Sequence, residues 1–592
     1  MDEASAQRTE TAAERIGGAR VAALVACAVL AAAWVLPVSL ERSWGYDESM
    51  HAQLPALRML YSARAGDFGQ AWDVLLGCNR YPFGYPVALA AAQAVFGTSE
   101  LVGRALGRAI WVLGCFAIFL LAQDVVARLG RCDPRAAGAD GRPRGAALAP
   151  WLALGLAAAS PMTLMYAGTL FLEVPFAVAA VCTLRSLLRW DEDGGGARRH
   201  ALALGAWVAL CFFIKFNYGL LLVAGVGLEL ACRTAAAVHA GRTGAVLRLL
   251  AWTVAVPALA AAWWFLWPLP AGAATAAVHR EAFLAYLTEN TDASMRVGWD
   301  YRFKDWSVYL VYSPLVLVAV VVGLVANCDR LARPGVRPLV FFALALLVPP
   351  AFHSFHVDRF LIPGAVALWV LAGLGLARLL PRGAVARAVV GAVSLAAIAL
   401  TAAPLAELAM DWVGLMPAEG RARDYARQVL AEHRSLNGAR PLVTVGLWRE
   451  DAEALSDCIA AGTGPDERIG WLGISSGYSR AALHAGLLAR GAPVARFLRD
   501  AEREMFVETA LADPGLDAAA LEQWAAGFDV ILYTAPVDLL DHHGRRFMQT
   551  YVDLLHAGGK WGCESIGSVA VADALRDARV VEVFACRRVP PR

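Results

Sequence analysis

The sequence is short of charged residues and lacks the cysteine patterns that mark many small domains. Only 18% of its 592 residues are charged and 58% are hydrophobic, whereas a soluble domain carries about a quarter charged residues. The eleven cysteines form no CxxC pair and no other metal-ligand spacing. No repeat of fixed period is present, and a net charge of +2 gives no indication of nucleic-acid binding. A soluble globular chain, a zinc module and a repeat array are therefore disfavoured.

Long apolar runs take the place of the missing charge, and the mean hydropathy is +0.50. Most runs have roughly twenty residues, which is enough to cross a bilayer core. We therefore predict an α-helical polytopic membrane protein with about eleven transmembrane helices. No small-residue cleavage site follows the polar N-terminus, so we expect the first helix to be retained. The predicted spans are 19–40, 100–122, 148–166, 170–188, 201–215, 218–232, 249–267, 307–327, 338–352, 360–378 and 388–405.

Arginine residues are concentrated in alternate loops, which sets the expected orientation. Cytoplasmic loops carry an excess of arginine and lysine, and an odd number of spans puts every arginine-rich loop on one side. The C-terminus and the loops 41–99, 268–306 and 353–359 are then on the outer side. The arginine-rich loops are 123–147, 189–200, 233–248, 328–338 and 379–387.

Three parts are expected along the chain. They are a cytoplasmic tail at 1–18, a membrane domain at 19–405 and an exoplasmic α/β domain at 406–592, where the composition becomes soluble in character. Within the outer loops, residues 86–97 and 279–290 are helical in pattern but too short to span. We expect both to lie in the membrane interface.

The C-terminal region alternates helical and strand-like stretches, as in an α/β domain. A glycine turn in 471–483 lacks GxGxxG and a Walker lysine, so an ordinary turn is favoured over a nucleotide site. "DHHGRR" at 541–546 is more typical of a surface turn than of a metal site. A disulfide can form among Cys458, Cys563 and Cys586, but the sequence leaves its pairing open. The expected strands are 441–448, 468–474, 528–534 and 580–587, and a helix is expected at 423–434.

Two adjacent acids follow the first span, in "WGYDESMHAQ" at 44–53. Asp47 and Glu48 can simply end the span, with Asp47 as the N-cap of the next helix. His51 lies one helical turn after Asp47, and Arg80 and Tyr81 occur later in the same loop. Because of these polar neighbours, the competing interpretation is that the two acids take part in a reaction.

Further ionisable residues are expected near the same outer face. Glu173 lies at the outer edge of a span, where an acid has a partner or a function unless it reaches water directly. Lys215 lies between two spans and can equally be an ordinary loop lysine. His353, His356, Asp358 and Arg359 form the densest polar cluster between late spans, and the loop before it adds Arg296, Arg302 and Lys304.

Cations beside carboxylates fit a reaction that releases a phosphate. Arginine side chains bind phosphate oxygens in bidentate fashion, and a carboxylate can accept a proton from an attacking hydroxyl group.

A series of segments in order resembles a known family. After the acid pair come "RYPFGYPVALAAAQAVFGTSELVGRALGRAIWVLG", "SPMTLMYAGTLFLEVPF", "LCFFIKFNYGLLL" and "HVDRFLIPGAVALWVLAGLG". Over about residues 20–405 the chain is similar to the GT-C superfamily of polyprenyl-phosphate-sugar glycosyltransferases. It resembles the protein O-mannosyltransferases and the aminoarabinose transferases of lipid A most.

The resemblance implies an integral enzyme, with its active site on the outer face of what is expected to be a bacterial plasma membrane. It implies a donor sugar on a polyprenyl phosphate, a hydroxyl-bearing acceptor and inversion at the anomeric carbon. Asp47 matches the general base of the family, and Glu48 matches the acid that helps to place the acceptor. Glu173 matches an acid before "VP", while Lys215 and Arg359 match basic positions. His356, Arg80 and Tyr81 join them as expected donor-phosphate or substrate contacts.

The chain also departs from the family. Relatives often carry His-Pro-Pro or Glu-Lys-Pro before the interfacial helix, whereas this chain has "NRYPFGYP", so Arg80 can replace the lysine while the nearby acid is missing. No cofactor is expected to be required, and a divalent metal ion stays an unsupported alternative. The competing function is a transporter or lipid flippase, whose polar groups would form a path through the spans.

Overall fold

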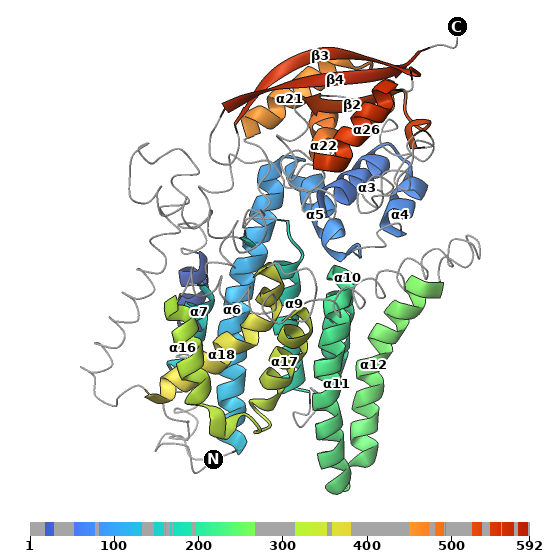
Figure 1. Cartoon of the computed structure of the whole chain (residues 1–592). Helices are drawn as coiled ribbons and strands as arrows, with labels where there is room; N and C mark the ends of the chain where they lie inside the picture. The colour runs from blue at the N-terminus through green and yellow to red at the C-terminus, as the bar shows by residue number, and fades with distance from the viewer. Residues whose placement is uncertain are drawn as a thin grey trace.

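The computed structural model describes a helical membrane domain and a C-terminal sheet with its helices (Figure 1). Five helices are long and apolar enough to cross a membrane: Leu101–Gly130, Ala197–Ile214, Phe216–His239, Thr243–Trp264 and Ile362–Leu379. The chain is therefore an integral membrane protein. The described residues are 18–28, 52–76, 82–132, 147–158, 160, 166–167, 170–190, 197–266, 314–351, 358–379, 449–472, 480–490, 492, 522, 524–535, 545–557, 559–572 and 578–589.

Each expected span that the structure describes, in whole or in part, contains a helix. The span expected at 388–405 lies outside the described residues. The first helix is described at Gly18–Ala28. The others are α6 (Glu100–Cys132), α7 (Ala149–Ala158), α9 (Glu173–Leu188), α10 (Ala197–Ile214), α11 (Phe216–His239), α12 (Thr243–Leu266), α16 (Pro314–Val325), α17 (Arg337–Ala351) and α18 (Ile362–Leu379).

Small residues let these helices approach closely, as is usual where lipid supplies no hydrophobic drive for helix association. A side chain at Gly375 on α18 would collide with the backbone of Gly323 on α16. On the same helix, a Cβ at Gly373 would lie 2.7 Å from the amide nitrogen of Ala153 on α7. α18 is thus held between two neighbours by backbone contact.

Three shorter helices lie together at one end of the bundle, beside the C-terminal sheet (Figure 1). They are α3 (Leu54–Arg64), α4 (Phe68–Leu76) and α5 (Gly84–Phe96). α5 coincides with the helix expected at 86–97, and Val95 and Phe96 at its end are largely exposed. The second expected interfacial helix, 279–290, lies outside the described residues.

The C-terminal sheet has four strands in the order β1-β2-β4-β3. β1 (Ile469–Trp471) runs parallel to β2 (Val530–Ala535), and the other neighbours are antiparallel. β4 (Ala578–Arg588) and the two strands just named coincide with expected strand segments. β3 (Trp561–Ala572) was not expected from the sequence, and the strand expected at 441–448 lies outside the described residues, as does the helix at 423–434.

Helices cover both faces of this sheet, which gives it two apolar layers. α21 (Arg449–Gly462) and α22 (Arg480–Ala489) pack on the face that carries Val530 and Leu532. α26 (Arg545–Ala557) packs on the face that carries Ile531 and Tyr533. α22 also contacts α3, which joins the sheet domain to the membrane domain at this end of the bundle.

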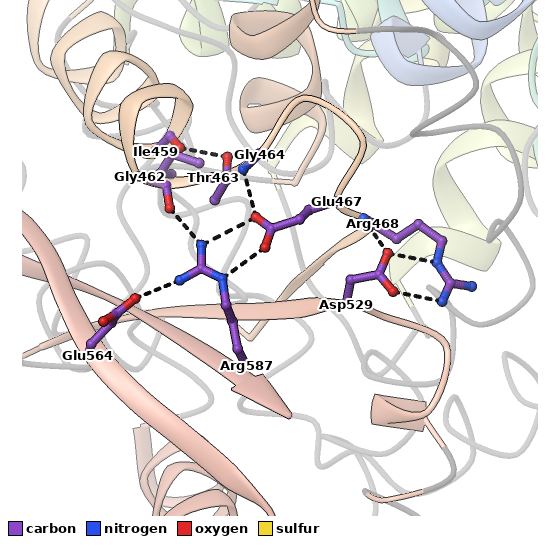
Figure 2. A network of polar contacts seen from close by, with 9 residues as sticks. All are labelled: Ile459, Gly462, Thr463, Gly464, Glu467, Arg468, Asp529, Glu564 and Arg587. Carbon is purple, nitrogen blue, oxygen red and sulfur yellow. Dashed lines mark hydrogen bonds and ion pairs between the residues drawn. The ribbon is translucent and has the colours of Figure 1, made fainter. Parts of the chain in front are cut away.

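A polar network lies at one end of the strands of the sheet (Figure 2). Arg587 on β4 donates to Glu467, Glu564 and the carbonyl oxygen of Gly462. Beside it, Arg468 forms a two-pronged contact with Asp529, with both nitrogen–oxygen distances at 3.0 Å. These contacts fix the connection between α21 and β1 against the neighbouring strands.

A disulfide joins Cys563 on β3 to Cys586 on β4, at directly paired positions. Cys458 is a free thiol on α21, which resolves the pairing that the sequence left open. The glycine turn at 473–479 and the "DHHG" segment at 541–544 lie outside the described residues.

Candidate functional site

A buried ion pair lies where α9 begins and where α10 gives way to α11. Lys215 separates the two helices with an extended backbone, at φ −154° and ψ 98°. Its Nζ atom donates a 2.7 Å hydrogen bond to Oε1 of Glu173. Glu173 occupies the first turn of α9, where the helix dipole favours a negative charge. The pair therefore ties the start of α9 to the break between α10 and α11.

Both partners are almost completely removed from solvent. The exposed fraction of the side chain is 4% for Lys215 and 2% for Glu173. Buried charges are tolerated when they are paired and hydrogen-bonded. The structure thus rejects two of the sequence alternatives, because Glu173 is not a shallow acid in contact with water and Lys215 is not an ordinary loop lysine.

Two aromatic rings surround the ammonium group of Lys215. Its Nζ atom lies 5.0 Å from the ring centroid of Tyr218 and 5.0 Å from that of Phe360, within the range of cation–π attraction. The Tyr218 hydroxyl donates a 3.0 Å hydrogen bond to the carbonyl oxygen of Phe360. Tyr218 also packs on Phe176 of α9, with ring centroids 5.4 Å apart.

This aromatic contact brings a second expected region to the ion pair. Phe360 belongs to the short 3-10 helix η4 (Asp358–Leu361), directly before α18. Arg359 precedes Phe360 in η4, so its backbone lies beside the ring that faces Lys215, although its side chain is outside what the structure describes. Three expected site residues, Glu173, Lys215 and Arg359, are thus placed on neighbouring elements.

The remaining expected site residues are not placed. Asp47, Glu48, Arg80, Tyr81 and His356 all lie outside the described residues. Among the residues that the structure describes, no group of three or more histidine, cysteine, aspartate or glutamate side chains could hold a metal ion.

An aromatic cluster anchors the start of α5 beside the ion pair. The Phe83 ring contacts Phe213 at the end of α10 and Trp263 and Trp264 on α12, with centroids 4.9, 5.5 and 5.3 Å away. A Cβ at Gly84 would lie 2.6 Å from the carbonyl oxygen of Phe213, so only glycine permits this close approach. Sequence reasoning missed these rings and Tyr218, because aromatic residues near span ends are common in membrane proteins.

The opposite ends of the helices carry a separate set of charges. Glu229 on α11 is fully buried and accepts hydrogen bonds from Arg233 and from Arg337 of α17. Asp124 on α6 pairs with Arg185 of α9 and with Arg189, directly after α9. These contacts lie in or beside the arginine-rich loops, and they lock helix ends together.

Comparison with known proteins shows which solved structures share this fold. No family model matches the chain, and no curated protein matches it in sequence. The solved structure of ArnT from Cupriavidus metallidurans bound to undecaprenyl phosphate is 17% identical with a TM-score of 0.54, and the match covers 96% of this chain and 98% of that one. Its apo state has a TM-score of 0.55 at the same identity and coverage.

An archaeal protein shows the same likeness. The oligosaccharyltransferase AglB from Archaeoglobus fulgidus, in complex with an inhibitory peptide and a dolichol-phosphate, is 12% identical with a TM-score of 0.50. That match covers 94% of this chain and 74% of AglB. These likenesses extend over nearly the whole chain, and they show that it shares the fold of ArnT and AglB.

Proposed function

We propose that the protein is an integral membrane glycosyltransferase that moves a sugar from a polyprenyl-phosphate donor to a hydroxyl acceptor. The observation that carries the proposal is the fold shared along the whole chain with ArnT, whose structure holds undecaprenyl phosphate. The buried Glu173–Lys215 pair supports it, because it brings two charges to the end of α10, a helix that contacts α5. Fold alone does not define a reaction, so the site residues carry the rest of the proposal.

In the proposed reaction, Asp47 accepts the proton of the acceptor hydroxyl group while the oxygen of that hydroxyl group attacks the anomeric carbon. The bond between that carbon and the phosphate oxygen breaks, its electron pair stays on the phosphate, and the configuration inverts. Glu48 helps to place the acceptor. Polyprenyl phosphate is the leaving group, and preorganised cations lower the barrier by stabilising the charge that develops on it.

The structure changes the part that we assign to Lys215. Its ammonium group is already neutralised by Glu173 at 2.7 Å, so it contributes less net positive charge than an isolated lysine would. The guanidinium groups of Arg80 and Arg359 are the proposed forks on the phosphate oxygens, with Tyr81 and His356 as further donor contacts. Glu173 and Lys215 then hold the elements around that phosphate in place.

The same proposal includes the topology of the protein. The proposed protein has eleven spans, a cytoplasmic tail at 1–18, a membrane domain at 19–405 and an exoplasmic domain at 406–592, and it lies in a bacterial plasma membrane. The Cys563–Cys586 disulfide supports an exoplasmic sheet domain, because disulfides persist in oxidising compartments. We also propose that this domain helps to present the acceptor, which its contact with α3 supports.

A transporter is the alternative, and the placement of charge argues against it. A transport path needs polar groups near the middle of the membrane. In α11, no aspartate, glutamate, lysine, arginine or histidine lies between Phe216 and Glu229, and in α9 none lies between Glu173 and Arg185. The charges of α9 are near its two ends, and those of α11 begin at Glu229, in the second half of the helix.

The test is transfer by the full-length protein in phospholipid vesicles. A panel of polyprenyl-phosphate sugars is supplied with acceptor extracts from a deletion strain, and transferred sugar and released polyprenyl phosphate are measured by mass spectrometry. We expect one donor to be consumed, and Asp47→Asn to abolish its consumption. The matched control is Asp67→Asn in the same loop, where Asp67 is exposed and accepts a hydrogen bond from the amide of Gln70, a role that asparagine also fills. Retained transfer by Asp47→Asn would overturn the assignment of the base, and consumption of no donor would overturn the proposed function.

A further inference from the structure

We propose that Tyr218 is a positioning residue for the donor phosphate, because its hydroxyl holds the backbone turn that carries Arg359. The inference rests on the proposed function and concerns a residue that the sequence did not single out. The contact joins α11 to η4 across 142 positions of the chain. It therefore fixes two elements that no local interaction holds together.

The hydrogen bond is directed at a specific backbone atom. The Tyr218 hydroxyl donates to the carbonyl oxygen of Phe360 at 3.0 Å, and Tyr218 is only 3% exposed. The Phe360 carbonyl belongs to the peptide bond next after Arg359, so movement of this group moves the arginine backbone. In a site without competing water, such a bond is stronger than at a surface.

The ring of Tyr218 is itself fixed from three directions. Phe176 of α9 packs on it, Phe360 lies edge-on with centroids 6.3 Å apart, and the Lys215 ammonium faces it. Glu173 in turn holds that ammonium group. The ion pair therefore helps to fix the Tyr218 ring. The hydroxyl group of that ring in turn fixes the turn before α18.

Lysine is well suited to the position between the two rings. The chain uses arginine for nearly all its positive charge and has lysine only at 215, 304 and 560. An ammonium group is a compact point charge that fits between Glu173 and both rings. The planar guanidinium group of arginine is larger and demands a different geometry. Lys215→Arg keeps the charge but is expected to displace Phe360.

The experiment removes one oxygen atom. Tyr218→Phe keeps every ring contact and deletes the hydrogen bond to Phe360. Its matched control is Tyr533→Phe in the sheet domain, which deletes a 2.8 Å hydrogen bond between the hydroxyl and His556. Full-length proteins in lipid nanodiscs are compared by hydrogen exchange of the peptide that covers 358–366, by their affinity for undecaprenyl phosphate and by their Tm.

We expect Tyr218→Phe to speed exchange in 358–366 and to weaken undecaprenyl phosphate binding about tenfold, the factor that one well-placed hydrogen bond is worth. The control should change neither. In an Arg359→Gln background, Tyr218→Phe should weaken binding no further, because both substitutions remove the same contribution.

Each other outcome contradicts the inference at an identifiable step. Unchanged exchange in 358–366 shows that Tyr218 does not hold the turn, whatever the protein binds. If exchange is faster but Tyr218→Phe leaves the affinity unchanged, the turn does not position Arg359 on the phosphate. The same conclusion follows if Tyr218→Phe and Arg359→Gln weaken binding additively. A wild-type protein that binds no undecaprenyl phosphate removes the role in donor binding, while consumption of a donor from the panel of polyprenyl-phosphate sugars separately decides whether transfer occurs.

Discussion

At the scale of single residues, the site depends on two opposite charges that are buried as a pair. Glu173 and Lys215 are both buried, so each is tolerated because the other is present. Their pairing could not be read from the sequence, because the two residues are 42 positions apart and meet only once α9 packs on α10. The sequence did single out Glu173, since an acid beside an apolar span is costly, whereas Lys215 could equally have been an ordinary loop lysine and was singled out only by the family resemblance.

Lys215→Met is expected to destabilise the protein by about 3–5 kcal/mol, because it leaves the Glu173 carboxylate buried without its cation. The double variant Glu173→Gln/Lys215→Met should recover most of that loss. Thermal unfolding in detergent measures both. Lys560→Met is the control, since its pair with Glu522 is half exposed and is worth about 0–1 kcal/mol. A double variant no more stable than Lys215→Met would contradict the account.

The Arg468–Asp529 pair, directly before β1 and β2, gives a pH dependence. The hydrogen bond from Arg468 lowers the pKa of Asp529 in the folded protein, relative to about 3.9 in an unfolded chain. The pair therefore stabilises the sheet domain above that value, and the contribution is lost as pH falls through the folded pKa. Arg468→Gln should raise the proteolysis rate of the domain at pH 7, and the difference from wild type should shrink below about pH 4. A difference that stays constant with pH would contradict this.

At the scale of elements, regular patterns were predictable and close approaches were not. The apolar pattern of residues 86–97 predicted α5, whereas β3 was missed because "WGCESIGS" resembles a loop and becomes a strand by pairing with β4. Likewise, the sequence showed glycines in the spans but not which of them lie at crossings. Gly323 and Gly375 are at the crossing of α16 and α18.

Gly375→Ala is expected to lower stability by about 1–3 kcal/mol, because the new methyl group overlaps the backbone of α16. The matched control is Gly227→Ala on α11, where nothing lies within 4 Å of the new Cβ. There, alanine should raise stability by about 0.5–1 kcal/mol through its helix propensity. The Tm values of the two variants in detergent should therefore shift in opposite directions, and a shift of the same sign and size in both would contradict the packing.

At the scale of the whole molecule, two chemically distinct ends emerge. One end has the short helices and the sheet (Figure 1), together with the Glu173–Lys215 pair and the disulfide, and the other has arginine-rich ion pairs. Charge patterns in the sequence predicted this separation, because loop arginines report orientation. The sequence left open how the acids and bases at the first of these ends are arranged, because that arrangement depends on contacts between distant helices.

The predicted orientation can be tested with the thiol of Cys328, which is free and exposed between α16 and α17. A variant that keeps Cys328 as its only thiol should react with a membrane-impermeant maleimide in inside-out vesicles and not in intact spheroplasts. In wild-type spheroplasts, Cys563 and Cys586 should react only after reduction. Labelling of Cys328 from outside the cell would contradict the topology.

The central claim is that the lipid-phosphate donor binds at the end of the bundle that carries Glu173, Lys215 and Tyr218. The most direct test is photolabelling of the protein in vesicles with a polyprenyl phosphate that carries a photoreactive group beside the phosphate. Adducts mapped by mass spectrometry should fall on residues 80–87, 212–218 and 358–361, and unlabelled polyprenyl phosphate should compete for them. Adducts concentrated on the arginine-rich helix ends at 185–199, 233–248 and 328–337 would contradict the account.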